Sequence, residues 1–271
     1  MSGNGDVSSE IRSDVFSLEL YRETLEKAIS LGYSFPTVSE LKGGTKSRDK
    51  FLLLRHDIDT SPLYALRMAK LEHSLGVRSS YYVLMHSPFY NPGSPQHWDA
   101  LKNLVSLGFE VGLHYETDFF EQRNIDALEG VLSDVAALEK ILHIKIRSVS
   151  QHRPASGTFL KKLNEYYVDA YNEDLMHNVR YISDSGFKWR NEPLLDIVGK
   201  ENRIHALIHP FTWIFGDLDM AGSYRRASEE ICLGIRQSFE EFIASTNLYL
   251  AKREQLDAAR KAQYVGQSGR Q

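Results

Sequence analysis

The sequence predicts an α/β protein whose parallel strands form an open sheet or a closed barrel. Short apolar runs, typical of buried parallel strands, alternate with amphipathic stretches at helical spacing. The tripeptide SLG also occurs three times, at residues 30–32, 74–76 and 106–108, each time between an amphipathic and an apolar stretch. Because glycine favours the residue after a helix, each copy predicts a helix followed by a strand.

The predicted elements follow one another along the chain. Apolar residues at helical spacing mark one helix before each SLG: Leu18, Tyr21, Leu25 and Ile29; Leu63, Leu66, Ala69 and Leu71; Trp98, Leu101, Leu104 and Val105. Five runs are the expected strands: FLLLRH (51–56), RSSYYVLMH (78–86), FEVGLH (109–114), IKIRSVSQH (144–152) and RIHALIHP (203–210). Residues 171–194 are the least regular stretch and are expected to form a long loop or short hairpins. A long C-terminal helix is expected to pack outside through Ile231, Ile235, Phe239, Phe242 and Ile243.

Composition narrows the functional classes. The 271 residues are 42% apolar and 25% charged, which is ordinary for a globular protein. A net charge of -4 argues against nucleic acid or an anionic membrane as the partner. The single cysteine, Cys232, excludes an intramolecular disulfide and is expected to be buried. We expect a mobile N-terminus (1–14), one domain (15–250) and a helical or mobile tail (251–271), in a cytoplasmic protein without a membrane span.

Histidines recur where the predicted strands end. His56, His86, His114 and His152 end four runs, and His209 ends a fifth. The carboxyl ends of parallel strands lie on one side of an α/β fold, where ligands bind. These histidines are therefore expected to converge.

Two carboxylates join the first of these strand ends. Asp57 and Asp59 are separated by one residue, so in extended chain they point the same way. One could hold a metal while the other acts as a base. The alternative is that they cap a helix beginning near Ser61, which Asp59 could do and Asp57 could not easily do as well.

Five motifs appear in a characteristic order: RHDID (55–59), EVGLHYETD (110–118), HRPASG (152–157), SDSG (183–186) and IHPFTW (208–213). With these motifs the chain resembles the polysaccharide deacetylases of the NodB-homology class. The resemblance is to a branch associated with bacterial surface polysaccharide biosynthesis, whose first motif reads H-D-x-D. It covers roughly residues 15 to 245. It implies an irregular (β/α) barrel with fewer than eight strands and metal-dependent hydrolysis of an N-acetyl group on a sugar.

The resemblance also implies roles for individual residues. Asp57 matches the general base, Asp59 and His114 match metal ligands, Arg153 matches the residue that tethers the base, and His209 matches the general acid. A divalent ion, most often zinc, held by carboxylate and imidazole lowers the pKa of bound water toward about 7 and polarises the amide carbonyl.

The second motif departs from the family pattern. A second histidine usually follows the first by four residues, and here that position is Asp118. Asp118 could ligate instead, Glu116 could reach in, or His152 could complete the set from the neighbouring strand end. His152 is favoured because imidazole suits such a site.

Other residues are candidates for substrate binding. Asp184 could bind a sugar hydroxyl or only shape a turn, Trp213 and Trp189 could stack on a sugar face, and His86 could line the groove. His205, His143 and His73 are assigned to structure.

The leading hypothesis is a deacetylase acting on an acetamido sugar or on a nucleotide- or lipid-linked glycan precursor. Two alternatives stay open. One is hydrolysis of another non-peptide C–N bond, and the other is a non-catalytic carbohydrate-binding relative that has lost the metal.

Overall fold

The computed structural model describes residues 16–45, 49–154, 158–177, 179–190, 192–216 and 218–268, with side chains described up to residue 260. The expected mobile N-terminus (1–14) and residues 155–157 of the HRPASG motif lie outside the described residues. The chain divides into two compact units, one ending at Met220 and the other beginning at Ala221.

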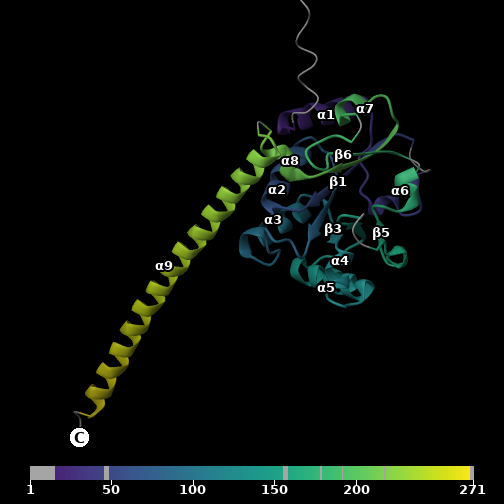
Figure 1. Cartoon of the computed structure of the whole chain (residues 1–271). Coiled ribbons are helices and arrows are strands. Elements are labelled where there is room, and N and C mark those ends of the chain that lie inside the picture. Colours follow the sequence, from purple (N-terminus) through teal and green to yellow (C-terminus); the bar gives the residue numbers. More distant parts are fainter. Residues whose placement is uncertain are drawn as a thin grey trace, which may run out of the picture. The chain divides into compact units, whose positions relative to one another are not determined.

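The first unit is built on a parallel sheet of seven strands in the order β5-β4-β3-β2-β1-β7-β6. Figure 1 shows the sheet with helices around it. The strands are β1 (Phe51–Ile58), β2 (Ser80–Leu84), β3 (Glu110–Tyr115), β4 (Ser148–Gln151), β5 (Val168–Asp169), β6 (Arg180–Ser183) and β7 (Arg203–Ile208). The sheet curls so that its edges approach each other: the rings of Tyr171, just after β5, and Tyr181, on β6, have centroids 6.5 Å apart. The prediction of an irregular (β/α) barrel with fewer than eight strands is confirmed.

Helices connect the strands. Those of the first unit are α1 (Leu18–Ser30), α2 (Pro62–Ser74), α3 (Pro95–Ser106), α4 (Thr117–Glu121), α5 (Ala127–Leu142), α6 (Glu173–His177), α7 (Leu194–Ile197) and α8 (Pro210–Ile214), with 3-10 turns at Ser39–Leu41 and Lys161–Glu165. The three SLG tripeptides end α1, α2 and α3 as predicted. Gly32, Gly76 and Gly108 follow with φ of +77°, +70° and +88°, a conformation that favours glycine.

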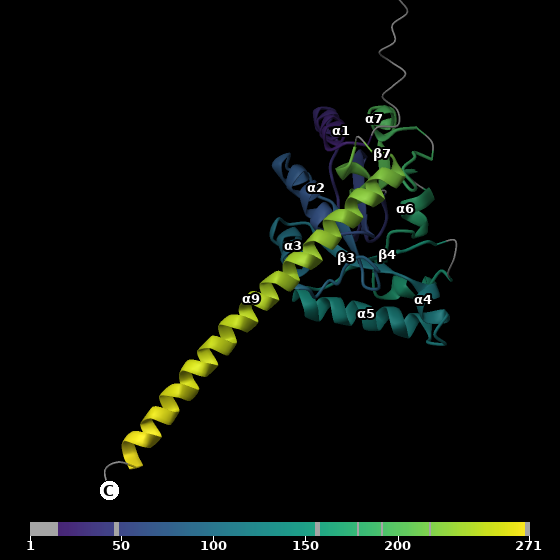
Figure 2. The ribbon, with the colours of Figure 1, turned by 60° about the vertical axis from the view of Figure 1, so that its left-hand side comes forward.

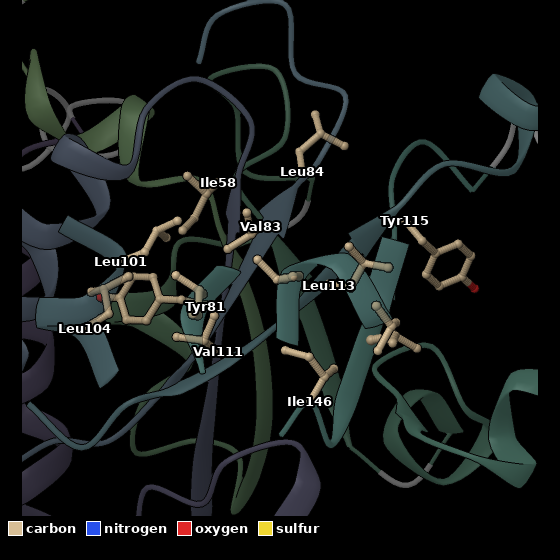
Figure 3. Close-up of a cluster of buried hydrophobic side chains, with 14 of the residues drawn as sticks. Ile58, Tyr81, Val83, Leu84, Leu101, Leu104, Val111, Leu113, Tyr115 and Ile146 are labelled. Atoms are coloured by element: carbon tan, nitrogen blue, oxygen red, sulfur yellow. The ribbon is translucent and has the colours of Figure 1, made fainter. Parts of the chain in front are cut away.

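Helices α1, α2, α3 and α5 cover the outside of the sheet (Figure 2). Figure 3 shows one outer cluster, in which Tyr81 and Val111 of the sheet lie near Leu101 and Leu104 of α3. Fully burying a side chain of this size stabilises the fold by about 1.5–3 kcal/mol. These clusters hold the strands in place and so position the residues at their ends.

The barrel interior changes from apolar to charged along β1. Phe51 and Leu53 belong to an inner apolar cluster, and Arg55 and Asp57 follow at the same two-residue period. Beside them, a Cβ atom on Gly112 would lie 2.5 Å from the Tyr82 ring and 2.6 Å from the Ser148 carbonyl oxygen. Glycine at 112 therefore leaves room for the Tyr82 side chain, whose hydroxyl is 2.9 Å from Ser148 Oγ.

Residues 171–194 are more regular than predicted. They contain α6 and the parallel strand β6, which pairs with β7 through Tyr181 and Ile182 among others. The expectation of a long loop or short hairpins was wrong because β6 spans only four residues, too few to show an alternating pattern.

The second unit consists of the long helix α9 (Met220–Ser268) from its second residue onward. The long C-terminal helix was expected, but only Ile231 of its five marker residues is half-buried; Ile235, Phe239, Phe242 and Ile243 are exposed. Cys232 is also exposed, so the expectation of a buried thiol was wrong. Among the described residues, no helix combines the length and apolarity needed to cross a membrane.

Candidate active site

A pocket of about 370 Å³ opens at the carboxyl ends of the strands. Parallel pairing brings these ends together, which places β1, β3, β4 and β7 around one opening. Its lining includes Asp57, Asp59, His114, His152, Arg153 and His209, and also Tyr171, Tyr181 and Arg190. Six residues chosen from the sequence as catalytic or metal-binding therefore meet in one pocket.

Asp59, His114 and His152 form a cluster whose ligand atoms all lie within 4.8 Å of one another. Nε2 of His114 is 3.4 Å from Asp59 Oδ1, and Nε2 of His152 is 4.0 Å from Asp59 Oδ2. Two imidazoles and one carboxylate are a common ligand set for a catalytic zinc ion, which keeps its fourth position for water.

The other ring nitrogen of each histidine is held by a separate group. His114 Nδ1 is 2.9 Å from the Ser150 carbonyl oxygen, and His152 Nδ1 is 2.8 Å from Glu116 Oε1. A proton on Nδ1 satisfies both contacts and leaves Nε2 with a lone pair aimed at the cluster. Metal-binding histidines in proteins almost always have such a partner.

Asp59 provides the test of whether these residues fit a metal. Its Oδ1 is buried, and when His114 carries no proton on Nε2 this oxygen has no hydrogen-bond partner among the described residues. A buried carboxylate oxygen without a partner is costly unless a cation compensates it. Zinc or another divalent ion at this oxygen and the two Nε2 atoms would satisfy all three, so the donor set fits a metal.

Asp57 lies beside the cluster and is paired with Arg55. The guanidinium donates two hydrogen bonds, from Nε to Oδ1 at 3.0 Å and from Nη2 to Oδ2 at 2.7 Å, and both side chains are buried. Burial alone would raise the pKa of Asp57, but Arg55 and then His114 outweigh it and hold the pKa well below its usual range. Asp57 is therefore an ionised carboxylate, as a base must be.

His114 is buried next to both Asp57 and Asp59, and these two carboxylates change its pKa. Its Nε2 is 3.5 Å from Asp57 Oδ2. Burial lowers the pKa of His114, but the two carboxylates more than compensate and raise it. In the free protein a proton can thus occupy the place between imidazole and carboxylates, and a metal would have to displace it.

His209 also lies near Asp59, with Nε2 3.8 Å from Asp59 Oδ2. Its Nδ1 is 2.6 Å from Asp184 Oδ1. Although burial lowers the pKa of His209, Asp184 and then the pocket carboxylates raise it to about 9. His209 is therefore protonated at neutral pH, as a general acid must be.

Asp184 is fully buried and holds His209 in place instead of reaching the pocket. Besides the imidazole, it accepts hydrogen bonds from the His209 backbone N–H and from Trp213 Nε1 at 2.8 Å. Trp213 is itself buried in an outer apolar cluster, and Trp189 packs against that cluster. Neither tryptophan nor Asp184 is among the described residues that line the pocket.

The histidines converge only in part. His114, His152 and His209 meet, but His56 alternates to the outer face of β1, where its Nε2 is 2.7 Å from the buried Glu72 carboxylate. His86 contacts Asp134 Oδ2 at 2.9 Å and stacks on Phe119 with ring centroids 3.7 Å apart. The expectation that all five histidines converge was wrong. His56 is next to Asp57 in β1 and so points to the opposite face of the strand, and His86 lies in a turn after β2.

Arg153 and Asp118 lie close to the cluster in sequence. Arg153 is an exposed residue of the pocket lining with a φ of +45°, which is unusual for a residue other than glycine. Arg55 makes a paired contact with Asp57, and the tether role that the resemblance assigned to Arg153 stays a prediction. Asp118 lies in α4, and the group that meets metal geometry contains His152 in its place.

Sequence reasoning missed Arg55, Ser150 and the two tyrosines of the pocket. Arg55 could have been predicted, because residues 55, 57 and 59 are two positions apart and so lie on the same face of an extended strand. Ser150 Oγ is 3.3 Å from Asp57 Oδ1 and 3.2 Å from His114 Nδ1. The Tyr171 ring lies 4.2 Å from the Arg55 guanidinium, a cation–π contact between distant segments that no local pattern could reveal.

No family model and no curated protein matches the chain. Among solved structures, it is similar to the peptidoglycan deacetylase PdaC from Bacillus subtilis, at 19% identity over 70% of this chain and 85% of that chain, with a TM-score of 0.42. The deacetylase PplD from Streptococcus pyogenes, solved in complex with acetate, matches at 12% identity over 77% and 88%, with a TM-score of 0.42. A CE4 family pseudoenzyme from Bacillus anthracis matches at 14% identity over 72% and 63%, with a TM-score of 0.41.

Proposed function

We propose that this protein is a metal-dependent hydrolase that removes an N-acetyl group from an acetamido sugar. The observation that carries the proposal is the Asp59–His114–His152 cluster with an ionised Asp57 and a protonated His209 beside it. An amide hydrolase needs a base and an acid at once, and environments that push two pKa values in opposite directions supply both.

Asp59, His114 and His152 would hold the metal, and a set of two imidazoles and one carboxylate favours zinc. When bound, such an ion polarises the amide carbonyl and lowers the pKa of the attacking water. Glu116 and the Ser150 carbonyl keep the two imidazoles oriented through their Nδ1 atoms.

Asp57 would take the proton of the attacking water, since its carboxylate lies 3.5 Å from His114 Nε2 and thus next to the ligands. Arg55 keeps that carboxylate ionised and fixes its orientation through two hydrogen bonds. His209 Nε2 would donate a proton to the sugar nitrogen as the C–N bond breaks, and Asp184 keeps the imidazole charged and in place. The products would be acetate and an amino sugar.

The substrate would enter between Tyr171, Tyr181 and Arg190 of the pocket lining. Aromatic rings suit the apolar face of a sugar, and an arginine suits a hydroxyl or an anionic group. We propose an acetamido sugar or a nucleotide- or lipid-linked glycan precursor in the cytoplasm as the substrate.

Acetate release tests this function. The zinc-loaded protein is incubated with a panel of free, nucleotide-linked and polymeric acetamido sugars, beside Asp57→Asn and the control His86→Ala, whose histidine contacts Asp134. Turnover that Asp57→Asn reduces by about 10²–10⁴ and that His86→Ala retains supports the proposal. Release of ammonia or of a ring-opened product without acetate would instead support another C–N hydrolase, and sugar binding without zinc binding would support a non-catalytic relative.

A further inference from the structure

Helix α9 carries exposed large apolar side chains, and most of them lie along one stripe or, like Ile243 and Leu250, at its edge; Leu233 and Leu248 lie off it. Ile235, Phe242, Tyr249 and Leu256 recur every seven residues and are 54%, 68%, 62% and 62% exposed, and Phe239 on the same stripe is 65% exposed. Adding Cys232 and Thr246 gives the alternating three- and four-residue spacing of a coiled-coil seam. The stripe spans 25 residues from Cys232 to Leu256, about 37 Å of helix.

A helix of this kind is stable when its apolar stripe is buried. Most helical stability in proteins comes from packing an amphipathic face, and large contiguous apolar patches left exposed mark interaction sites. Residues 237, 244, 251 and 258, on the face opposite the stripe, are glutamine or alanine. One stripe on a long helix fits one partner helix.

Charge changes sign along α9 and favours an antiparallel partner of the same sequence. Residues 229–245 contain four acidic residues and one basic residue, whereas residues 246–260 contain three basic and two acidic residues. An antiparallel copy of the same helix would place the acidic half against the basic half. We propose that α9 pairs with α9 of a second copy of this chain as an antiparallel two-helix coiled coil.

Two other arrangements fit less well. A parallel pair would place acidic half against acidic half and would set Arg253, which lies on the seam, against Arg253 of the second copy. A membrane surface calls for a polar face rich in lysine and arginine. Residues 229–260 instead have six acidic and four basic residues, a net charge of -2.

Seam packing fixes the register. In an antiparallel pair the register that sets Phe239 beside Tyr249 of the second copy also sets Phe242 beside Thr246, Cys232 beside Leu256 and Ile235 beside the aliphatic stem of Arg253. The exposed parts of three aromatic side chains from each copy would bury on the order of 800 Å², at roughly 150–250 Å² per aromatic side chain. The aliphatic residues of the seam would bring the total to the size of a specific interface, about 1,200–2,000 Å².

Sedimentation of the full chain tests the pairing. The parent should be a dimer in micromolar solution, and Phe239→Asp with Phe242→Asp should weaken dimerisation by about a hundredfold or more. The matched control, Gln237→Asp with Ala244→Asp, adds the same charges to the opposite, exposed face and should leave the dimer intact. A monomeric parent, a dimer that survives the phenylalanine changes, or an equal effect of both pairs of changes would overturn the proposal.

The single cysteine tests the orientation. In the antiparallel register the two Cys232 residues are about 36 Å apart along the helices. Mild oxidation should leave the parent unlinked, should link Leu256→Cys into a covalent dimer, and should not link the control Ala258→Cys, which lies on the opposite face. Linkage of the parent, or none in Leu256→Cys, would overturn the antiparallel register.

Discussion

Replacing Arg55 with alanine tests the pair that holds the base. Both side chains of the Arg55–Asp57 pair are essentially inaccessible to solvent, and two hydrogen bonds join them. Removing the arginine leaves a buried carboxylate without its cation, which costs about 3–5 kcal/mol in the free energy of unfolding. That is a large share of the roughly 5–15 kcal/mol typical of a folded protein.

Arg78 supplies a matched control. It also forms a double contact with a carboxylate, that of Glu40, but its side chain is 50% exposed. Arg78→Ala should cost at most about 1 kcal/mol, because exposed ion pairs contribute little.

Urea unfolding at neutral pH measures both variants, together with Asp57→Asn and the double variant Arg55→Ala/Asp57→Asn. The double variant should lose less stability than the two single losses combined, since neutralising Asp57 removes the uncompensated charge. Equal losses for Arg55→Ala and Arg78→Ala, or strictly additive losses in the double variant, would refute the reasoning.

Three further predictions concern the metal, the acid and the barrel interior. His114→Ala should abolish zinc binding in isothermal titration while the control His86→Ala binds as the parent does; equal affinities would remove His114 from the ligand set. Asp184→Asn should shift the alkaline limb of the pH–rate profile to lower pH, because Asp184 helps to raise the pKa of His209 to about 9 and a general acid works only while protonated. Asp134→Asn is the control. An alkaline limb that does not move in Asp184→Asn would contradict the role of His209 as the general acid. Burial lowers the pKa of His205 to about 3. Below about pH 6.5 the unfolded chain therefore binds a proton that the folded chain does not. The free energy of unfolding should decrease as the pH is lowered, by up to about 1.4 kcal/mol per pH unit. Urea unfolding of His205→Gln should show a shallower loss between about pH 6 and 4 than the exposed-site control His73→Gln, and parallel curves would argue against it.

Local patterns were sufficient to predict most of the fold. Apolar runs and the SLG helix ends located β1, β2, β3, β4 and β7, because buried strands and glycine caps have short-range signatures. The strands β5 and β6 have two and four residues and lie at the sheet edges, and their pairing depends on contacts distant in sequence. The C-terminal helix was visible from its apolar stripe, but its exposure was not.

The candidate site was predicted in composition more than in contacts. Strand parity correctly placed Asp57 and Asp59 on one face, and the same argument applied to Arg55 would have found the partner of Asp57. That argument would also have sent His56 to the opposite face, toward Glu72. The roles of Asp184 and Trp213 depend on β6 and α8 meeting in space, which one sequence does not show.

The central claim is that Asp59, His114 and His152 bind a catalytic metal. Anomalous diffraction at the zinc edge from crystals of the zinc-loaded protein tests it most directly, since it locates the ion without reference to activity. The account predicts one strong peak about 2.0–2.2 Å from a carboxylate oxygen of Asp59 and from Nε2 of both histidines. A peak coordinated by other residues, or no peak in this pocket from protein saturated with zinc, would contradict it.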